Sequence, residues 1–354
     1  MRVFVQVVLT AVLATIAAGF LALAGSAIAQ TRVPVSAPTP IAAYGGRLVW
    51  SRPDGAGGFE LVQRVGDGPV TRLPVPSRSV PFDVDLGPTS GGRVLAVYTR
   101  CANEPTPTQG SSTPLYETGR GCDVYKLDVG RGREVRYTKV NASDATEFWP
   151  TYWKGRLGFA RVYDNGLGSS HLYVKDVASS RPSERLPGGP DFTSRELHSC
   201  GEQLCPNVRR PMPGQLELYG SRLAFTWPLP GKEGSADELR VDTVGTKDSL
   251  VLDRGSSGLT RLEVAWPSFE GGRAYWAHPC SGDSSGCTPA RVRLSTSTYT
   301  GDIVELGAPS PDWVLSHERA GGITWVLHPS PDSPVPNACP CVLEPLRPSY
   351  KPLR

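Results

Sequence analysis

The stretch KGRLGFARVYD, residues 154–164, is a tight turn followed by a short apolar run, and its first half has relatives along the chain. The copies are GGRLVW at 45–50, GGRVLAVY at 91–98, GSRLAFTW at 220–227, GGRAYWA at 271–277 and AGGITWV at 320–326. The equivalent turn positions are Arg47, Arg93, Arg156, Arg222, Arg273 and Gly322. Periods of about 40 to 50 residues are typical of repeat architectures. The chain is therefore expected to contain six similar units.

Each unit has the pattern of four short antiparallel strands, because brief apolar runs alternate with Gly, Pro and polar turn signals. Within residues 147–189 the expected strands are Thr151–Trp153, Leu157–Val162, His171–Val177 and Glu184–Leu186. The other units repeat this order. The sixth offers DWVLS at 312–316, GITWVL at 322–327 and CVLEPL at 341–346, and no fourth strand follows.

Six four-stranded units predict an all-β fold, a six-bladed β-propeller in which each blade covers its apolar faces against its neighbours. The approximate blades are 41–75, 80–140, 147–189, 214–254, 262–308 and 311–346. The ring also has to close, and the extended segment TRVPVSAPTP, residues 31–40, is expected to supply the strand that the sixth unit lacks. A β-sandwich and a pair of unrelated all-β domains are the alternatives.

The first 29 residues have the layout of a secretory signal peptide. One positive charge precedes an apolar run, which ends before Ala27-Ile28-Ala29. We therefore expect residues 30–354 to be a single propeller domain that is secreted or otherwise extracytoplasmic, without a membrane span. Because the apolar run is long for a signal peptide, an uncleaved N-terminal anchor is the alternative.

The eight cysteines fall in close pairs: Cys101 and Cys122, Cys200 and Cys205, Cys280 and Cys287, Cys339 and Cys341. An even number of cysteines in an exported chain indicates disulfide bonds. The connectivity stays open at this point. A bridge across Cys339-Pro340-Cys341 is expected to be strained. The alternative is that Cys339 or Cys341 bonds a cysteine elsewhere in the chain.

The unit 147–189 carries a set of pairs and runs that is typical of one propeller family. They are Trp149-Pro150, Tyr152-Trp153, Gly155-Arg156, Leu157–Ala160, Leu172–Val174 and Arg185-Leu186. This pattern resembles the repeat of TolB-type, WD-like β-propellers, although most turns here read Gly-Gly-Arg where that repeat has SPDG. The resemblance implies a six-bladed, exported propeller that is commonly a non-enzymatic binding scaffold, and it singles out no ligand.

Charge excludes some partners. The chain has 37 basic and 34 acidic residues and a formal net charge of +3, a balance that does not indicate binding to nucleic acid or an anionic membrane.

No motif predicts a catalytic, cofactor-binding or metal site. The loop GDSSG at 282–286 resembles the nucleophile loop of chymotrypsin-like proteases, but the residue after Ser284 is Ser285 where those proteases have Gly.

Two sets of residues have zinc-ligand types: His198 with Cys200 and Cys205, and His328 with Cys339 and Cys341. Exported thiols are usually oxidised, which makes zinc the weaker interpretation. The remaining histidines, His171, His278 and His317, are expected to have surface or packing roles. The recurrent tryptophans are expected to pack between blades: Trp50, Trp153, Trp227, Trp266, Trp276, Trp313 and Trp325.

Propeller glycosidases use carboxylates that come from different blades and meet near the axis. Candidates in or before first strands are Asp83, Asp85, Glu147, Glu217 and Glu263. They share no motif, so solvated strand positions are the simpler interpretation.

We therefore expect a non-enzymatic binding or protein-interaction scaffold. Its partner, an unknown protein or extracellular ligand, would bind loops at one end of the ring without a cofactor, and the longest insertions are residues 102–121 and 189–213. The alternative is an extracellular propeller hydrolase or lyase acting on polysaccharide or peptide. That enzyme would gather carboxylates of perturbed acidity near the axis. A purely structural envelope protein would have no ligand site.

Overall fold

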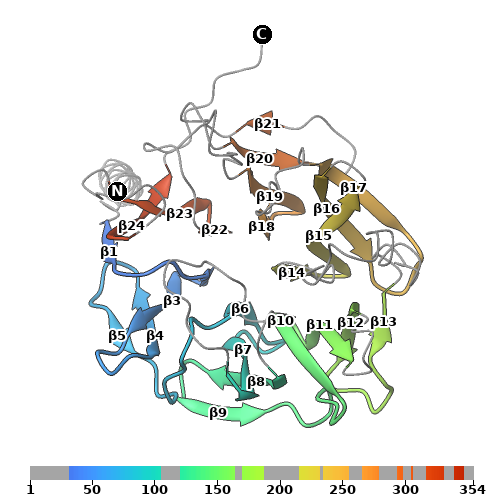
Figure 1. Ribbon diagram of the computed structural model, residues 1–354, viewed down its shortest axis with the longest axis horizontal. Helices are drawn as coiled ribbons and strands as arrows, with labels where there is room; N and C mark the ends of the chain where they lie inside the picture. Colours follow the sequence, from blue (N-terminus) through green and yellow to red (C-terminus); the bar gives the residue numbers. More distant parts are fainter. Residues whose placement is uncertain are drawn as a thin grey trace, which may run out of the picture. The chain divides into compact units, whose positions relative to one another are not determined.

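Short antiparallel strands build the whole described chain, and they pair into six four-stranded sheets. Figure 1 shows the sheets following one another around a common axis, with the first strand of each sheet nearest to it. The computed structural model describes residues 32–104, 120–163, 170–186, 215–231, 234–254, 265–278, 293–297, 304–305, 316–330 and 339–346. The predicted all-β propeller with four-stranded antiparallel blades is confirmed.

The strands of the first three sheets are β2 (Ile41–Tyr44), β3 (Arg47–Pro53), β4 (Phe59–Val65) and β5 (Thr71–Arg72); β6 (Asp85–Pro88), β7 (Val94–Asn103), β8 (Arg120–Asp128) and β9 (Arg133–Arg136); β10 (Ala145–Trp153), β11 (Arg156–Tyr163), β12 (Ser170–Asp176) and β13 (Glu184–Arg185). The next two contain β14 (Leu216–Tyr219), β15 (Arg222–Gly231), β16 (Gly234–Thr243) and β17 (Ser249–Arg254); β18 (Ala265–Glu270), β19 (Arg273–His278), β20 (Arg293–Ser297) and β21 (Val304–Glu305). The sixth sheet contains β22 (Ser316–Ala320), β23 (Ile323–Pro329), β24 (Cys341–Leu346) and β1 (Val33–Val35).

The N-terminal strand closes the ring. β1 pairs antiparallel with β24, with Val33 opposite Leu343 and Val35 opposite Cys341, and it forms the outer edge of the sixth sheet. The first strands also contact one another in a closed cycle, in which β22 of the sixth sheet lies against β2 of the first. The prediction that the segment 31–40 supplies the missing strand is confirmed.

Two innermost strands differ from the prediction. The first strand of the sixth sheet is β22, SHERA, where the apolar run DWVLS was expected. An innermost strand lies along the axis and can carry polar side chains. The search for an apolar run therefore selected the wrong segment. β10 begins at Ala145, well before Thr151, because a bulge after Phe148 interrupts its pairing with β11. The bulge contains Trp149 at a φ of 48°.

The register shows that the sixth turn was also placed one residue early. In the first, third, fourth and fifth sheets, the Arg after the turn pairs with the last residue of the first strand, as Arg47 pairs with Tyr44. In the sixth sheet Ile323 occupies this place opposite Ala320, so Ile323 and not Gly322 is the equivalent of Arg47.

Side chains of one sheet satisfy backbone groups on the free edges of the next. An innermost strand has one unpaired edge, and a buried N–H group without a partner destabilises a fold. The backbone N–H of Ile41 donates to Ser316 Oγ at 3.1 Å across the closure between the sixth and first sheets. The N–H of Leu218 likewise donates to Thr151 Oγ1 at 2.8 Å. These bonds join neighbouring sheets independently of apolar contact.

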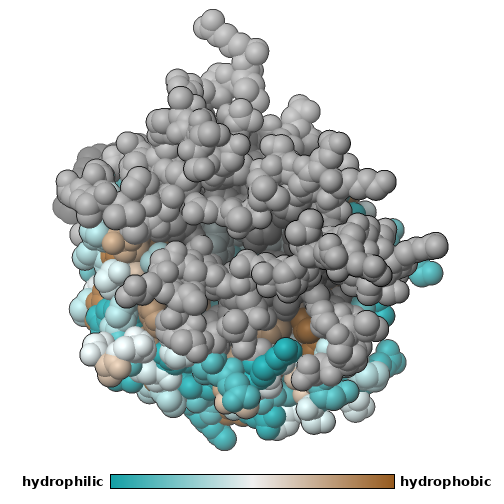
Figure 2. Space-filling view, in the orientation of Figure 1, coloured by the Kyte–Doolittle hydropathy of each residue, from teal (hydrophilic) through white to brown (hydrophobic). Residues whose placement is uncertain are grey.

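Several outermost strands are short or polar, which discourages pairing with other chains. β5 and β13 contain two residues each. On β9, Arg133 and Arg136 are exposed, and Figure 2 shows hydrophilic residues over the rim where β9 lies.

Both cysteine pairs within the described residues are bonded. Cys101 on β7 is joined to Cys122 on β8, and Cys339 is joined to Cys341 across a cis Cys339-Pro340 peptide bond. The other four cysteines, Cys200, Cys205, Cys280 and Cys287, lie outside the described residues, as does the predicted signal segment 1–29. None of the described residues forms a helix long and apolar enough to cross a membrane.

Replacing Val33 and Val35 with Asp should open the ring. Both side chains are buried, at 6% and 4% exposure, so the double variant loses apolar burial and places charge against the sixth sheet. We expect the free energy of unfolding to fall by at least about 3 kcal/mol, measured by urea denaturation with circular dichroism. The exposed Ser36→Asp is the matched control. Equal stability of the two variants would contradict closure by β1.

Gly87→Ala tests the close approach of the second and third sheets. A Cβ at Gly87 would lie 1.6 Å from the carbonyl oxygen of Tyr152, so a backbone has to move. We expect a loss of at least about 2 kcal/mol in unfolding free energy. Gly91→Ala, where the nearest atom is 3.9 Å away, should cost far less. A midpoint for Gly87→Ala that matches Gly91→Ala would refute this packing.

Candidate functional site

The antiparallel order gives the ring two different ends. At the turn end lie the connections from the first to the second strand of each sheet, such as residues 154–155, and those from the third to the fourth, of which the longest is 177–183. All other connections begin and finish at the opposite end, the loop end, including 104–119, 186–215 and 279–292. The two longest predicted insertions therefore both begin and end at the loop end.

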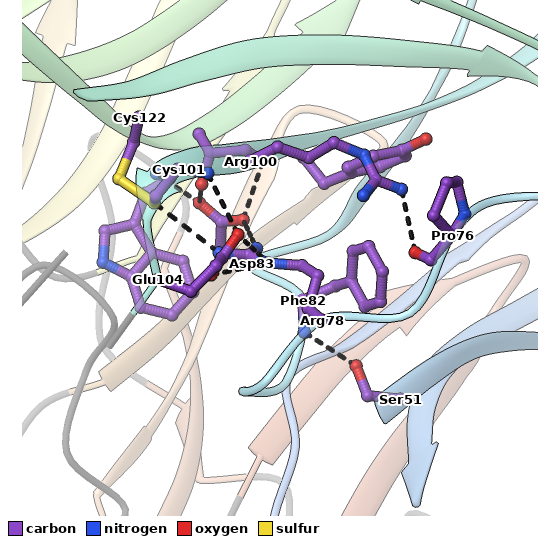
Figure 3. A network of polar contacts seen from close by, with 12 residues as sticks. Ser51, Pro76, Arg78, Phe82, Asp83, Arg100, Cys101, Glu104 and Cys122 are labelled. Carbon is purple, nitrogen blue, oxygen red and sulfur yellow. Dashed lines mark hydrogen bonds and ion pairs between the residues drawn. A yellow bond between two sulfur atoms is a disulfide. The ribbon is translucent and has the colours of Figure 1, made fainter. Parts of the chain in front are cut away.

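A buried polar network fixes the point where β7 leaves the ring at the loop end (Figure 3). The side chain of Arg78 is fully buried and forms ion pairs with Asp83 at 3.3 Å and Glu104 at 2.7 Å. Glu104 also accepts a hydrogen bond from the Cys101 N–H at 3.0 Å. With the Cys101–Cys122 disulfide, these contacts hold the two strands that flank residues 105–119.

Asp83 occupies the centre of this network. Its carboxylate accepts bonds from the N–H and hydroxyl of Thr99, at 2.8 and 2.7 Å, and from the Trp149 N–H of the third sheet at 3.1 Å. Burial raises the pKa of Asp83, and the Arg78 charge opposes this shift. Through these contacts Asp83 has a structural role that joins the second sheet to the third.

A second group of residues, of which four are polar, lies along the axis at equivalent places of the first strands. The second strand of each sheet is numbered from its turn residue, which is Arg47, Arg93, Arg156, Arg222, Arg273 or Ile323. The residue two positions after this turn residue pairs with one residue of the first strand, and these first-strand partners form the group. This axial row consists of Ala42, Gly87, Thr151, Glu217, Ser268 and Glu318. Glu217, Ser268 and Glu318 therefore occupy matching places in consecutive sheets.

Asp85 adjoins the axial row from the second sheet. It accepts a hydrogen bond from the Tyr152 N–H at 3.0 Å and forms a second with the Thr151 hydroxyl. The oxygen of this hydroxyl in turn accepts a hydrogen bond from the Leu218 N–H. Burial raises the pKa of Asp85 to about 6, although these bonds favour the ionised form. Asp85 thus links the second, third and fourth sheets through Thr151.

Glu217 and Glu318 have strongly perturbed acidity. Burial raises the pKa of both well above the usual range, and the negative charge of Asp85 raises each further. Glu318 adds to the shift of Glu217, and Glu270 adds to that of Glu318. Glu318 is 4% exposed, whereas Glu217 keeps part of its surface accessible although protein surrounds it. The three carboxyls are therefore coupled across the axis.

Aromatic rings gather on the turn side of this row. Tyr44, Trp153 and Tyr219 are each the last residue of a first strand and are partly exposed. Ring centroids of Tyr44 and Trp153 are 6.0 Å apart, and those of Trp153 and Tyr219 are 4.2 Å apart. Because Tyr44 and Tyr219 belong to opposite sheets, these contacts cross the axis. We call these three residues the aromatic lid.

No family model matches this chain. No curated protein matches it either.

Solved β-propellers do match. TolB from Acinetobacter baumannii is 12% identical with a TM-score of 0.46, covering 86% of this chain and 64% of TolB. The Aleuria aurantia lectin in complex with α-methyl-L-fucoside is 14% identical with a TM-score of 0.46, covering 84% and 90%. A prolyl endopeptidase is 14% identical with a TM-score of 0.41, covering 83% and 39%. Likenesses of this strength do not indicate what this chain binds.

The sequence candidates separate in the structure. Asp85 and Glu217 come together at the axis, whereas Asp83 lies in the loop-end network and Glu147 is ion-paired with Arg161 at 2.8 Å. Burial raises the pKa of Glu147 to about 7. Glu263 lies outside the described residues.

Sequence reasoning missed Glu318, Ser268 and the aromatic lid as a group. Glu318 stands in SHERA, which was not expected to be a strand, and Ser268 gives no signal until the register aligns it with Glu217. Packing of tryptophan is confirmed for Trp50, Trp276 and Trp325, which are buried in apolar clusters.

The structure describes some of the histidines and cysteines that were considered as packing residues or zinc ligands. His317 is fully buried with Nδ1 3.0 Å from the Trp266 carbonyl, and burial lowers its pKa to about 4. His328 binds Glu344 at 2.9 Å, while Cys339 and Cys341 are joined to each other. No group of metal-binding residues is found in the part of the chain that the structure describes. His198, Cys200 and Cys205 lie outside it, as does the 282–286 loop.

Glu318→Gln should flatten the pH dependence of stability. Because the folded pKa of Glu318 is raised, the native state retains a proton that the unfolded chain releases, so stability falls as pH rises toward the folded pKa. Each such group contributes a slope of up to about 1.4 kcal/mol per pH unit. Urea unfolding at about pH 6.5 and about pH 8 measures it, a range where the opposite effect of His317 is small. The exposed Asp67→Asn is the control, and an unchanged slope in Glu318→Gln would contradict the assignment.

Proposed function

We propose that this protein is an exported, TolB-like, six-bladed propeller that acts as a non-enzymatic binding scaffold through its loop end. The supporting observation is the unequal distribution of connections: every turn-end connection is short, and all the long ones start and finish at the loop end. Recognition residues commonly lie on loops that a rigid framework positions. We also propose residues 1–29 as a signal peptide and residues 30–354 as a single domain.

The loop-end framework is suited to this role. The fully buried Arg78 and its two carboxylate partners fix the strand end at Glu104, and the adjacent disulfide joins β7 to β8. A loop that departs from a fixed base loses less conformational freedom on binding. The disulfides also agree with an extracytoplasmic location, because such bonds persist in oxidising compartments.

A hydrolase or lyase is the second candidate, favoured by one observation. Asp85, Glu217 and Glu318 are coupled near the axis with raised pKa values, which is what an enzyme with carboxylate catalysis would have. Such chemistry needs one protonated and one ionised carboxyl flanking the substrate. Binding stays the first proposal because all the long connections begin and end at the loop end.

Replacing the loop-end insertions tests the scaffold. In one variant, residues 105–119 and 187–213 are exchanged for short Gly-Ser linkers, and a matched control changes the exposed turn-end residues Asp67, Arg156 and Lys247 to Ser. Proximity labelling on producing cells, read by mass spectrometry, should recover the same neighbours with wild type and control and lose them with the loop variant. Circular dichroism verifies folding of each.

Retention of these neighbours by a folded loop variant would rule out loop-end recognition. Release of products from a polysaccharide and peptide panel, abolished by Glu217→Gln or Glu318→Gln, would favour the enzyme.

A further inference from the structure

Buried carboxylates in this propeller are usually paired with arginine. Three examples are Asp83 with Arg78 at 3.3 Å, Glu147 with Arg161 at 2.8 Å and Glu238 with Arg240 at 2.6 Å. An uncompensated buried charge is strongly unfavourable, so such pairing is expected.

The axial carboxyls depart from this pattern. Among the residues that the structure describes, no Lys or Arg forms an ion pair with Asp85, Glu217 or Glu318. The nearby Arg319 is committed to Glu270, at 2.7 Å from its Nε. Asp85 raises the pKa of both glutamates, and Glu318 raises that of Glu217 further. No described cation therefore balances these carboxyls when they ionise.

Ser268 gives an independent indication of a ligand. Its side chain is fully buried, and within the described chain its hydroxyl has no hydrogen-bond partner. A buried hydroxyl left unpaired costs about 1–3 kcal/mol. By register, Ser268 lies between Glu217 and Glu318 in the succession of sheets. The unused hydroxyl thus belongs to the same row as the unpaired carboxyls.

The size and character of the missing cation follow from its surroundings. No group of three or more His, Cys, Asp or Glu side chains that could hold a metal ion is found within the described residues. Two residues along β14 from Glu217 lies Tyr219 of the aromatic lid, whose rings are partly exposed. Aromatic faces attract organic cations and pack against alkyl groups. These features suit a cation larger than a metal ion, with N–H donors and an apolar stem.

We infer that the axial row and the aromatic lid bind an alkylammonium group. Its N–H donors pair with the carboxylates of Glu217 and Glu318 and with Ser268 Oγ, and its alkyl stem lies against the rings of the lid. Asp85 adds negative charge from the second sheet. This site is at the turn end and does not rest on the loop-end scaffold, so either proposal can fail alone.

Binding should release protons, because carboxyls that are neutral in the free protein ionise to pair with the ammonium. The carboxyls facing or adjoining the site are Asp85 on β6, Glu217 on β14, Glu270 on β18 and Glu318 on β22. The other titratable or charged groups are Tyr44, Tyr219, His317, Arg319 and Lys154, whose Nζ lies 5.5 Å from the ring centroid of Trp153. His317, with its lowered pKa, stays neutral and does not compete. Affinity should therefore rise between about pH 5 and about pH 8.

Isothermal titration of the mature protein with n-butylammonium tests the site. We expect binding with net proton release, detected as a dependence of the heat on the ionisation enthalpy of the buffer. Glu217→Gln and Glu318→Gln should each weaken binding at least about tenfold, and Ser268→Ala about fivefold. Gln is close in shape to the protonated carboxyl, so both Gln variants should fold. The exposed Asp67→Asn is the matched control and should bind as wild type.

Three comparison ligands make the result decisive. Tetramethylammonium has no N–H donor and should bind at least about tenfold more weakly; equal binding would overturn the role of the carboxylates and Ser268 as acceptors. Nα-acetyl-lysine amide carries the same ammonium on an amino-acid stem, and its binding in place of butylammonium would identify a protein side chain as the source. Calcium binding that the Gln variants abolish would make this a metal site. No binding of either ammonium at millimolar concentration would overturn the proposal.

Discussion

Ring closure is the constraint on which the rest of this structure depends. A four-stranded sheet of such short strands cannot bury both faces alone, so each sheet relies on two neighbours. The pairing of β1 with β24 and the contact of β22 with β2 give the first and last sheets the neighbours that a linear stack would lack. Cross-sheet bonds such as Ile41 N–H to Ser316 Oγ extend this closure to the backbone near the axis.

Closure also explains where polar groups are buried. First strands converge on the axis with one edge unpaired, and side chains of neighbouring sheets have to satisfy those edges. Asp85 and Thr151 do so, which accounts for polar residues at places that a sandwich would fill with apolar ones. Glu217 and Glu318 differ, since burial and the negative charge of Asp85 raise the pKa of both and no described Lys or Arg forms an ion pair with either.

The two ends of the ring differ in the length of their connections. Tight turns limit the turn end to what the first strands themselves present, and there the aromatic lid stands above carboxyls and Ser268. Longer connections at the loop end leave a framework anchored by the buried Arg78. A scaffold that binds a partner at one end and an organic cation at the other would couple the two only if the sheets shift together.

The sequence by itself determined the all-β class, the four-stranded unit and the closing strand, because turn residues and apolar runs are local signals that repeat. It did not identify SHERA as a strand, because a strand at the axis does not need alternating apolar residues. It also did not show that β10 begins at Ala145, because the bulge at Trp149-Pro150 interrupts the strand pattern. Tertiary structure alone decided that Glu217, Ser268 and Glu318 form one row. Residues so far apart in the chain meet only because the ring closes and aligns the registers of three consecutive sheets.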